Sequence, residues 1–379
     1  MTETLIPIAP SVGKTGSVIC TRAELVEILT IIAGVMKQRT PRAVLQCVRL
    51  TTSDNALAMS GTNLQAWVVS RALKNQVEAA FDTAVPCERL LDILNAMSEE
   101  TVTLKITGTE LQVRGNNGTF KIPTQSVDEL PPEPHDDEEA SVELSADAFA
   151  RLARQALPCV GKPGSGVTSG LLITVDASGK VSFVSTEGHV LAIATASGTG
   201  TTGAFNMVVP PDAVRLAERA AGDSVRIAKA GPVALFHAGE TRIMSTQLEG
   251  EFPAYAGIVP TEKNYTLTVA REELSTAVRQ TSIIAKSDET RPALRFTIAP
   301  GTGIGILARN AEGEADVTLP CKVEGGEPME IGLNADYLMA GLSVMESAEL
   351  TIEMTVPSRP PLFRDGAEFL FLAMPINLA

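Results

Sequence analysis

The chain repeats one pattern three times, and this repeat limits the folds that it can adopt. A stretch typical of a helix opens at Thr21 (TRAELVEIL), returns at Ser145 (SADAFARLA) and returns again at Ala270 (AREELSTAV). The three starts lie 124 and 125 residues apart. Repeats of this length form separate domains, since about 100–150 residues suffice for a hydrophobic core. The sequence therefore predicts one domain, used three times.

A second helical stretch follows each of the first at a matching distance. These stretches are VPCERLLDIL from Val85, VPPDAVRLAE from Val209 and GLNADYLMAGL from Gly332. The helix expected at 86–98 has Leu90, Leu91, Leu94 and Met97 on one face, as in an amphipathic helix packed on a sheet. Residues 43–52, 171–186 and 293–309 are apolar or alternating runs with turn signals, typical of β-hairpins. We predict an α+β fold in which each of three repeated domains packs two helices on antiparallel sheets.

Changes in composition mark the domain boundaries. Residues 131–141 and 258–264 are rich in proline and charge, as linkers are. We expect a flexible N-terminal extension over 1–16, domain I over 17–136, domain II over 137–260 and domain III over 261–379.

The charge of the chain argues against tight binding to nucleic acid. The net charge is −14, and the acidity is concentrated in residues 131–141 and in the third repeat. A protein that binds DNA through many phosphate contacts carries a basic excess instead. Five scattered cysteines without a CxxC pair predict reduced thiols in a cytoplasmic protein, and no apolar run is long enough to span a membrane.

The sequence contains no convincing catalytic or metal-binding motif. Gly13-Lys14-Thr15 is similar to the end of a phosphate-binding loop, but that motif needs a glycine where Ile8 stands. The three histidines are too scattered in the pattern to suggest a metal site or a triad. We therefore expect no catalytic residue, no metal and no cofactor.

Five motifs, in order along residues 17–379, resemble the bacterial DNA polymerase III β sliding clamp family. They are GTNL (61–64), GTFKIP (118–123), TEGHVL (186–191), GEFPAY followed by IVP (250–260) and MPINL (374–378). Each motif alone is weak, but five in order on a threefold repeat are specific. The family forms a head-to-tail homodimeric ring of six similar domains around duplex DNA, and polymerases are tethered to it.

The resemblance implies a non-catalytic DNA sliding clamp, a processivity factor of bacterial replication. Its partners would be duplex DNA held without sequence preference, the DNA polymerase III catalytic subunit, the clamp loader and other clamp-binding-motif proteins, with no membrane. It would work in the cytoplasm, at the nucleoid during replication. Two alternatives stay open: a clamp-derived protein-binding scaffold that does not act on DNA, and an enzyme on a repeated α+β fold.

Three sets of site residues follow from the resemblance. The partner peptide would lie in a groove of Thr186, Gly188, His189, Val190, Leu191, Pro253, Ile258, Pro361, Leu372, Met374, Pro375, Ile376 and Leu378. DNA would be faced by Arg22, Arg39, Arg89, Arg151, Arg154, Arg215, Arg219, Arg271 and Arg279, although each could simply lie on a solvated helix face. The dimer interface would contain Lys105, Arg114, Phe120, Lys121, Ile122, Ile283, Ile284, Glu312, Glu314 and Asp316.

The chain departs from the family pattern in the expected groove. Val190 stands where the family usually has arginine, and Gly257 and Asn377 stand where basic residues are common. We therefore expect weaker contacts with acidic or polar peptides, while aliphatic anchoring is kept.

Overall fold

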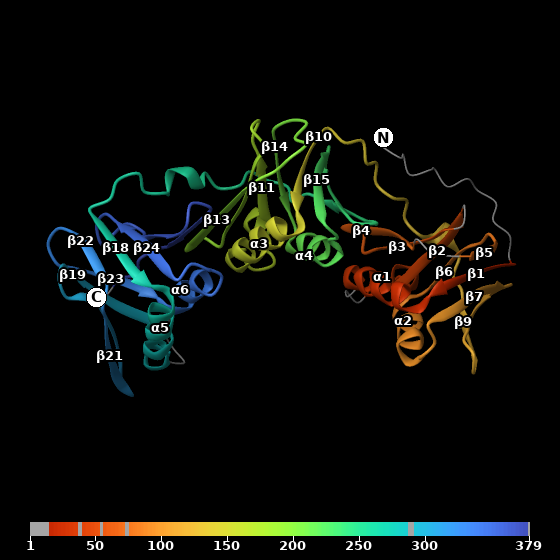
Figure 1. Ribbon diagram of the computed structural model, residues 1–379, viewed down its shortest axis with the longest axis horizontal. Helices are drawn as coiled ribbons and strands as arrows, with labels where there is room; N and C mark the ends of the chain where they lie inside the picture. The colour runs from red at the N-terminus through yellow and green to blue at the C-terminus, as the bar shows by residue number, and fades with distance from the viewer. Residues whose placement is uncertain (1–14, 37–39, 54–55, 73–75, 287–291, 378–379) are drawn as a thin grey trace. The chain divides into compact units, whose positions relative to one another are not determined.

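The computed structural model describes residues 15–36, 40–53, 56–72, 76–286 and 292–377 (Figure 1). Three repeats of one element order follow each other along the chain. Each repeat opens with a strand and a helix, continues with a run of strands, and reaches a second strand and helix before its last three strands. The predicted α+β fold with antiparallel sheets is confirmed.

The bounds of the elements are as follows. The first repeat contains β1 Thr15–Thr21, α1 Arg22–Val35, β2 Cys47–Ser53, β3 Ala56–Thr62, β4 Ala66–Ala72, β5 Gln76–Ala79, β6 Asp82–Pro86, α2 Cys87–Ala96, β7 Thr101–Thr107, β8 Glu110–Arg114 and β9 Thr119–Pro123. The second contains β10 Ala140–Ser145, α3 Ala146–Ala156, β11 Leu171–Val175, β12 Lys180–Thr186, β13 Val190–Ser197, β14 Phe205–Val209, α4 Pro211–Ala220, β15 Ser224–Ala230, β16 Val233–Ala238 and β17 Thr241–Thr246. The third contains β18 Tyr265–Ala270, α5 Arg271–Ala285, β19 Ala293–Ala299, β20 Gly303–Asn310, β21 Gly313–Leu319, β22 Lys322–Gly325, β23 Met329–Asn334, α6 Ala335–Leu342, β24 Glu349–Met354, β25 Leu362–Asp365 and β26 Phe369–Ala373.

The repeats do not coincide with the two compact units of the chain. Unit 1 contains the described residues up to Glu138 together with Arg215–Thr246. Its strands form a five-stranded sheet in the order β5-β1-β7-β8-β9 and a second sheet with the run β15-β16-β17-β4-β3-β2-β6. Helices α1 and α2 lie side by side in this unit (Figure 1).

Unit 2 contains Glu139–Val214 and Gln247–Ala379. Its nine-stranded sheet has the order β14-β11-β12-β13-β26-β25-β24-β18-β22, and its four-stranded sheet has the order β21-β20-β19-β23. Helices α5 and α6 lie side by side here, as α1 and α2 do in unit 1 (Figure 1).

Each unit contains one strand pair that joins two successive repeats. In the first joint, β4 of repeat one pairs antiparallel with β17 of repeat two. In the second joint, β13 of repeat two pairs antiparallel with β26 of repeat three. The strands β4 and β13 occupy equivalent places in their repeats, and so do β17 and β26. The same connection is therefore made twice.

Local sequence explains where the helices form. In α1, Leu25, Ile28, Leu29 and Ile32 follow the spacing of one helix face, and all four are buried. The Ser145 hydroxyl accepts a hydrogen bond from the Ala148 N–H at the start of α3. The Asn334 side chain accepts the N–H groups of Asp336 and Tyr337 at the start of α6. These caps satisfy N–H groups that the first helical turn leaves without partners.

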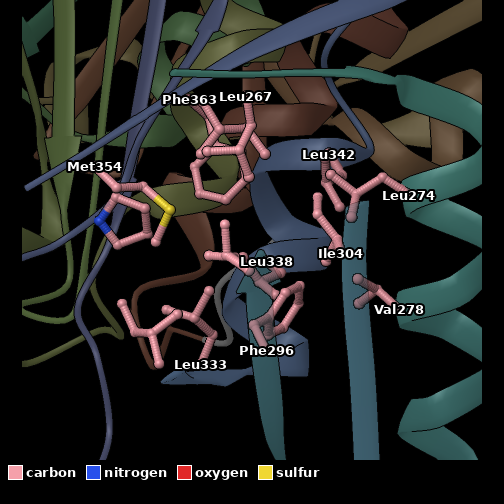
Figure 2. A pocket seen from close by; sticks show the side chains of 14 residues that line it. Leu267, Leu274, Val278, Phe296, Ile304, Leu333, Leu338, Leu342, Met354 and Phe363 are labelled. Atoms are coloured by element: carbon pink, nitrogen blue, oxygen red, sulfur yellow. The ribbon is translucent and has the colours of Figure 1, made fainter. Parts of the chain in front are cut away.

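The core of repeat three encloses a small apolar cavity (Figure 2). Leu274 and Val278 of α5 project toward Ile304 of β20, and Leu338 of α6 lies near Phe296. The free volume is about 20 Å³, and the lining presents no polar surface. A water molecule needs two to four polar partners, so the cavity is a packing gap rather than a ligand site.

The structure differs from the sequence predictions in two local respects. Residues 43–46, expected to begin a strand, form the 3-10 helix Ala43–Gln46, and the strand starts only at Cys47. The strand β1 begins at Thr15, two residues before the predicted start of domain I, while residues 1–14 of the predicted extension lie outside the described part. The three domain boundaries stay predictions. Among the described residues, no helix is long and apolar enough to cross a membrane.

Candidate functional site

An apolar cluster lies on the sheet at the second joint. We call it the second-joint cluster, and its buried members are Leu172, Val184, Leu191, Ile193, Val208, Leu362 and Leu372. Partly buried side chains pack against it: Val167, Leu248, Phe252, Tyr255, Val259 and Leu370. A sheet face that met only water would carry polar residues at these alternating positions. The cluster is thus a buried apolar layer built from two repeats, with partly buried apolar side chains at its edge.

Two large apolar side chains are exposed beside this cluster. Met374, 38% exposed, follows β26, and its N–H donates to the carbonyl of His189 at 2.7 Å. Ile258, 45% exposed, precedes Val259, which packs on the cluster. Exposed apolar groups that adjoin a larger apolar surface indicate an interaction site.

The loop between β12 and β13 is fixed by its own hydrogen bonds. The Thr186 hydroxyl donates to the Val190 carbonyl at 2.6 Å and accepts the N–H of Gly188 at 3.1 Å. Gly188 has a φ of +99°, which a residue with a Cβ adopts only with strain. The His189 ring stacks on Tyr337 with centroids 5.3 Å apart, and its Nδ1 lies 3.2 Å from Glu187 Oε1. The loop is therefore held firmly against repeat three.

The structure brings together some of the predicted groove residues and separates others. Leu191 and Leu372 pair directly across the joint and belong to the cluster. Thr186, Gly188, His189, Pro253, Ile258, Met374, Pro375 and Ile376 lie in the segments around it, and the Ile376 N–H donates to Gly332. Val190 is buried on the opposite face of β13, because successive strand residues alternate. Pro361 lines the interior cavity of repeat three, and Leu378 lies outside the described residues.

Sequence reasoning missed most of the buried cluster. Leu172, Val184 and Val208 come from β11, β12 and β14 and lie outside the recognised motifs. The available signal was apolar alternation on strands whose outer face should otherwise be polar. Leu248, in the segment after β17, also lies outside the motifs, whereas Phe252 belongs to the GEFPAY motif but was not predicted as a groove residue.

The predicted DNA-facing arginines fall into two groups. Four of them are engaged within the protein. Arg22 donates to the carbonyls of Glu99 and Leu94, and Arg271, at the equivalent place in repeat three, donates to that of Ser347. Arg151 forms an ion pair with Glu368 at 2.8 Å, and Arg154 forms one with Glu346. These contacts hold helix ends and repeats together.

The second group lies on the surface. Arg89, Arg215, Arg219 and Arg279 are exposed on α2, α4 and α5. Arg279 donates to the Thr276 hydroxyl of its own helix at 3.2 Å, a contact that leaves the side chain at the surface. Arg39 lies outside the described residues.

The predicted dimer residues lie on two outer strands. The strand β9 ends the five-stranded sheet of unit 1, and β21 ends the four-stranded sheet of unit 2. Phe120 and Lys121 on β9 and Arg114 on β8 are exposed, as is Lys105 on β7, whereas Ile122 of β9 is 1% exposed and belongs to the core. On β21 and the turn before it, Glu312, Glu314 and Asp316 are exposed. Ile283 of α5 is 72% exposed, and Ile284 is half-buried against Gly313.

The buried cysteines offer no nucleophile. Burial raises the pKa of the thiols of Cys20, Cys87 and Cys159 to about 12 and that of Cys47 to about 11. These groups stay protonated at neutral pH, and the thiol is not the reactive form.

Comparison with known proteins agrees with the geometry of the repeats. Residues 17–134 match the family described as "DNA polymerase III beta subunit, N-terminal domain", and residues 256–375 match its C-terminal domain. The beta sliding clamp of Synechococcus elongatus is 25% identical over 95% of this chain and 99% of its own length, and that of Vibrio cholerae is 26% identical over 94% and 98%.

Solved structures share the fold. The DNA polymerase sliding clamp of Bacillus subtilis superposes with a TM-score of 0.90 at 19% identity, covering 96% of this chain and all of that one. The C. crescentus beta sliding clamp, with polyethylene glycol bound to a putative beta-motif tethering region, gives 0.89 at 23% identity over 96% and 100%. The chain belongs to the DNA polymerase III beta-subunit family, the non-catalytic sliding clamps that serve as processivity factors.

Proposed function

We propose that two copies of this chain close head to tail into a ring around duplex DNA and that partner proteins dock on the second-joint cluster. The observation that carries the ring is the repeated joint. Each joint pairs the strand in the β4 position of one repeat with the strand in the β17 position of the next. The equivalent strands left over are β21 of repeat three and β9 of repeat one.

Outer strands such as these support closure between copies. An unpaired strand edge presents N–H and C=O groups that can pair with another chain. If β21 of one copy paired with β9 of the next, the same joint would recur at every repeat boundary. A symmetric dimer would make this contact twice and leave no such edge open.

Side chains on the two edges are complementary. Exposed Glu312, Glu314 and Asp316 lie on β21 or the turn before it, whereas exposed Lys121 lies on β9, Arg114 on the neighbouring β8 and Lys105 on β7, one strand further in. Glu314 already contacts Arg309 at 3.3 Å and Lys121 contacts Glu110 at 3.6 Å, so pairing between copies would compete with these bonds. Phe120 and Ile283 would supply the apolar contact, and Ile122 would support it from the core.

We expect the contact between the ring and DNA to have low affinity. Arg89, Arg215, Arg219 and Arg279 are exposed, as is Arg154 in its ion pair with Glu346, while the net charge of the chain is −14. Few phosphate contacts give low affinity and a shallow dependence on salt. A closed ring would not need affinity, because it is linked to DNA topologically and can slide. Such a factor would work in the bacterial cytoplasm, at the nucleoid.

The mass of the protein in solution tests the ring. At micromolar concentration we expect twice the chain mass of 39.9 kDa by light scattering. Phe120→Asp or Ile283→Asp should give a folded monomer, since each places a charge in the apolar contact. Leu64→Asp is the matched control, because Leu64 is 43% exposed, as Phe120 is, but lies in the loop between β3 and β4, which belong to a different sheet from β9 or β21. A monomeric parent protein, or edge variants that remain dimers, would refute the closure.

A further inference from the structure

The segment after β17 gives the second-joint cluster an acidic border. Leu248 and Phe252 both pack on the cluster, so the three residues between them lie along its edge. Gly250 supports this placement, since a Cβ there would lie 3.6 Å from Val167, another residue packed on the cluster. The remaining two residues, Glu249 and Glu251, are exposed.

Basic side chains are missing from the segments that frame this surface. Residues 181–214, 243–262 and 365–377 contain no lysine or arginine. They contribute Glu249, Glu251 and Glu187, of which Glu187 lies beside His189 in the loop before β13. The frame of the cluster is therefore negative.

Nearby cations do not cancel the negative charge around the second-joint cluster. Lys263 and Arg364 both bind the carboxylate of Glu353, at 2.9 and 2.8 Å, so this group carries a single net positive charge. Lys162 is exposed in the loop that precedes Val167. Glu249 and Glu251 have no ion pair with any described residue, which leaves their carboxylates open to a ligand cation.

We propose that the second-joint cluster selects extended peptides whose aliphatic anchors are flanked by lysine or arginine. This inference rests on the proposed function and adds the charge of the partner. The apolar anchors would contact the cluster beside Met374 and Ile258, and the basic flank would lie over Glu249 and Glu251. An acidic flank would meet like charge there and lose affinity.

Three synthetic peptides with identical leucine and phenylalanine anchors test the proposal. Their flanking positions carry lysine, glutamine or glutamate, and their dissociation constants are measured by fluorescence anisotropy at 50 and 500 mM salt. We expect the lysine peptide to bind about three- to tenfold tighter than the glutamine peptide at low salt, as two exposed ion pairs allow. The glutamate peptide should bind most weakly, and high salt should bring the three affinities together.

Charge reversal locates the effect. Glu249→Lys with Glu251→Lys should invert the order of the lysine and glutamate peptides and leave the glutamine peptide unchanged. The control is Asp223→Lys with Glu240→Lys, an equal charge change at exposed sites of unit 1, which should keep the original order.

The outcomes separate this inference from the proposed function. Equal affinities of the three peptides, or an order that the reversal does not change, would overturn the charge preference and leave docking intact. If none of the three peptides binds, both proposals are refuted: peptide docking on the cluster and the preference for basic flanks.

Discussion

The two joints share one backbone arrangement and differ in what their side chains do with it. The Thr62 hydroxyl donates to Ala66 and accepts from Leu64 N–H, as Thr186 does with Val190 and Gly188. Next to these loops, Thr246 N–H donates to the carbonyl of Gln65, as Met374 N–H does to that of His189. The strand pairing and the loop bonds are thus the same in both units.

The side chains differ on the strands that precede β4 and β13. In unit 2, Leu172 pairs with Val184 and Val208. In the equivalent register of unit 1, Arg49 pairs with Ser60 and Ala84, and its guanidinium binds Asp82 at 2.6 and 2.9 Å. Buried apolar residues at one joint thus correspond to a partly buried ion pair at the other.

The linker residues that form ion pairs next to each joint also have opposite charges. At the first joint, Glu133 and Asp136 of the acidic linker bind Arg242 of β17. At the second, Lys263 of the linker binds Glu353 of β24. An apolar cluster therefore lies at both joints, around Met244 and Trp67 in the first, but only the cluster of the second joint extends onto β11, β12 and β14.

The largest expected effect comes from truncating equivalent joint residues. Met244 faces Trp67 in the first joint and Leu372 faces Leu191 in the second, and both are buried. Met244→Ala and Leu372→Ala should each lower the stability of their unit by about 2–5 kcal/mol. The single tryptophan, Trp67, reports denaturant unfolding of unit 1, and hydrogen exchange of β13 and β26 reports unit 2.

Peptide binding separates these two variants. Leu372→Ala should weaken binding of the glutamine-flanked peptide, whereas Met244→Ala should leave it unchanged at a temperature where both are folded. Equal losses would contradict the assignment of docking to the second joint alone.

A smaller effect is expected from the ion pairs beside the joints. The side chains of Arg242 and Glu353 are 13% and 14% exposed, and each contacts two opposite charges. Arg242→Gln and Glu353→Gln should each cost about 1–2 kcal/mol, since partly buried partners lose a charged hydrogen bond. High salt should reduce the loss only slightly, in contrast to exposed pairs.

The pH dependence of stability distinguishes the ion pairs of Glu353 from those of Arg242. Burial raises the pKa of Glu353, but hydrogen bonds from Lys263 and Arg364 together outweigh it and the pKa is lowered. The ionised Glu353 therefore adds to the stability of the folded unit above the ordinary pKa of 4.5. This stabilisation is lost as the pH falls through the lower pKa of the folded state. Unfolding of Glu353→Gln followed over this acidic range should show a flatter pH dependence than the parent; parallel curves would argue against the pair.

Exchanging the loop residues tests the strain at the joints. Leu64 has a φ of +75°, where asparagine is tolerated better, so Leu64→Asn should stabilise unit 1 by about 0.5 kcal/mol. Gly188→Ala should destabilise unit 2 by about 1 kcal/mol, because alanine is strained at +99°. Thermal unfolding of both variants measures these changes in stability. If the two substitutions changed stability in the same direction, the two loops would not be equivalent.

The smallest effect is the pH response of the first joint. Burial lowers the pKa of His237, which faces Glu138, Arg226 and Arg242. The folded unit thus binds a proton less readily than the unfolded chain, and stability should fall as the pH drops below the ordinary value of 6.5. Trp67-detected unfolding between pH 7.5 and 5.5 should show a steeper loss in the parent than in His237→Gln. Identical slopes of stability against pH in the two proteins would show that His237 does not cause the pH response.

The sequence was sufficient to predict the repeat and the helices. The stretches from Thr21, Ser145 and Ala270 lead into α1, α3 and α5, because their apolar spacing is local. An Asn-Gly pair is typical of a tight hairpin turn, and between β8 and β9, at Asn117-Gly118, the N–H of Gly115 donates to the carbonyl of Gly118 at 3.0 Å.

Contacts between distant residues could not be read in the same way. Pairing of β13 with β26 joins strands almost 180 residues apart, so alternation within either strand does not reveal it. Nor does the sequence show that Arg151 binds Glu368, since an arginine on a polar helix face has the same pattern whether it meets solvent or a carboxylate. The motif match supplied the segments around the cluster, and only the tertiary structure separated Leu191, in the cluster, from Val190, behind it.

Retention on circular DNA tests the sliding-clamp account most directly. The protein is loaded on a nicked circular plasmid with a clamp loader, washed at 500 mM salt, and the bound fraction is measured before and after the plasmid is cut once. Counterion competition removes proteins held by phosphate contacts, but it cannot release a linked ring. We predict retention on the circle and loss within minutes of linearisation. Equal retention on circular and linear DNA, or loss from both at this salt, would contradict the account.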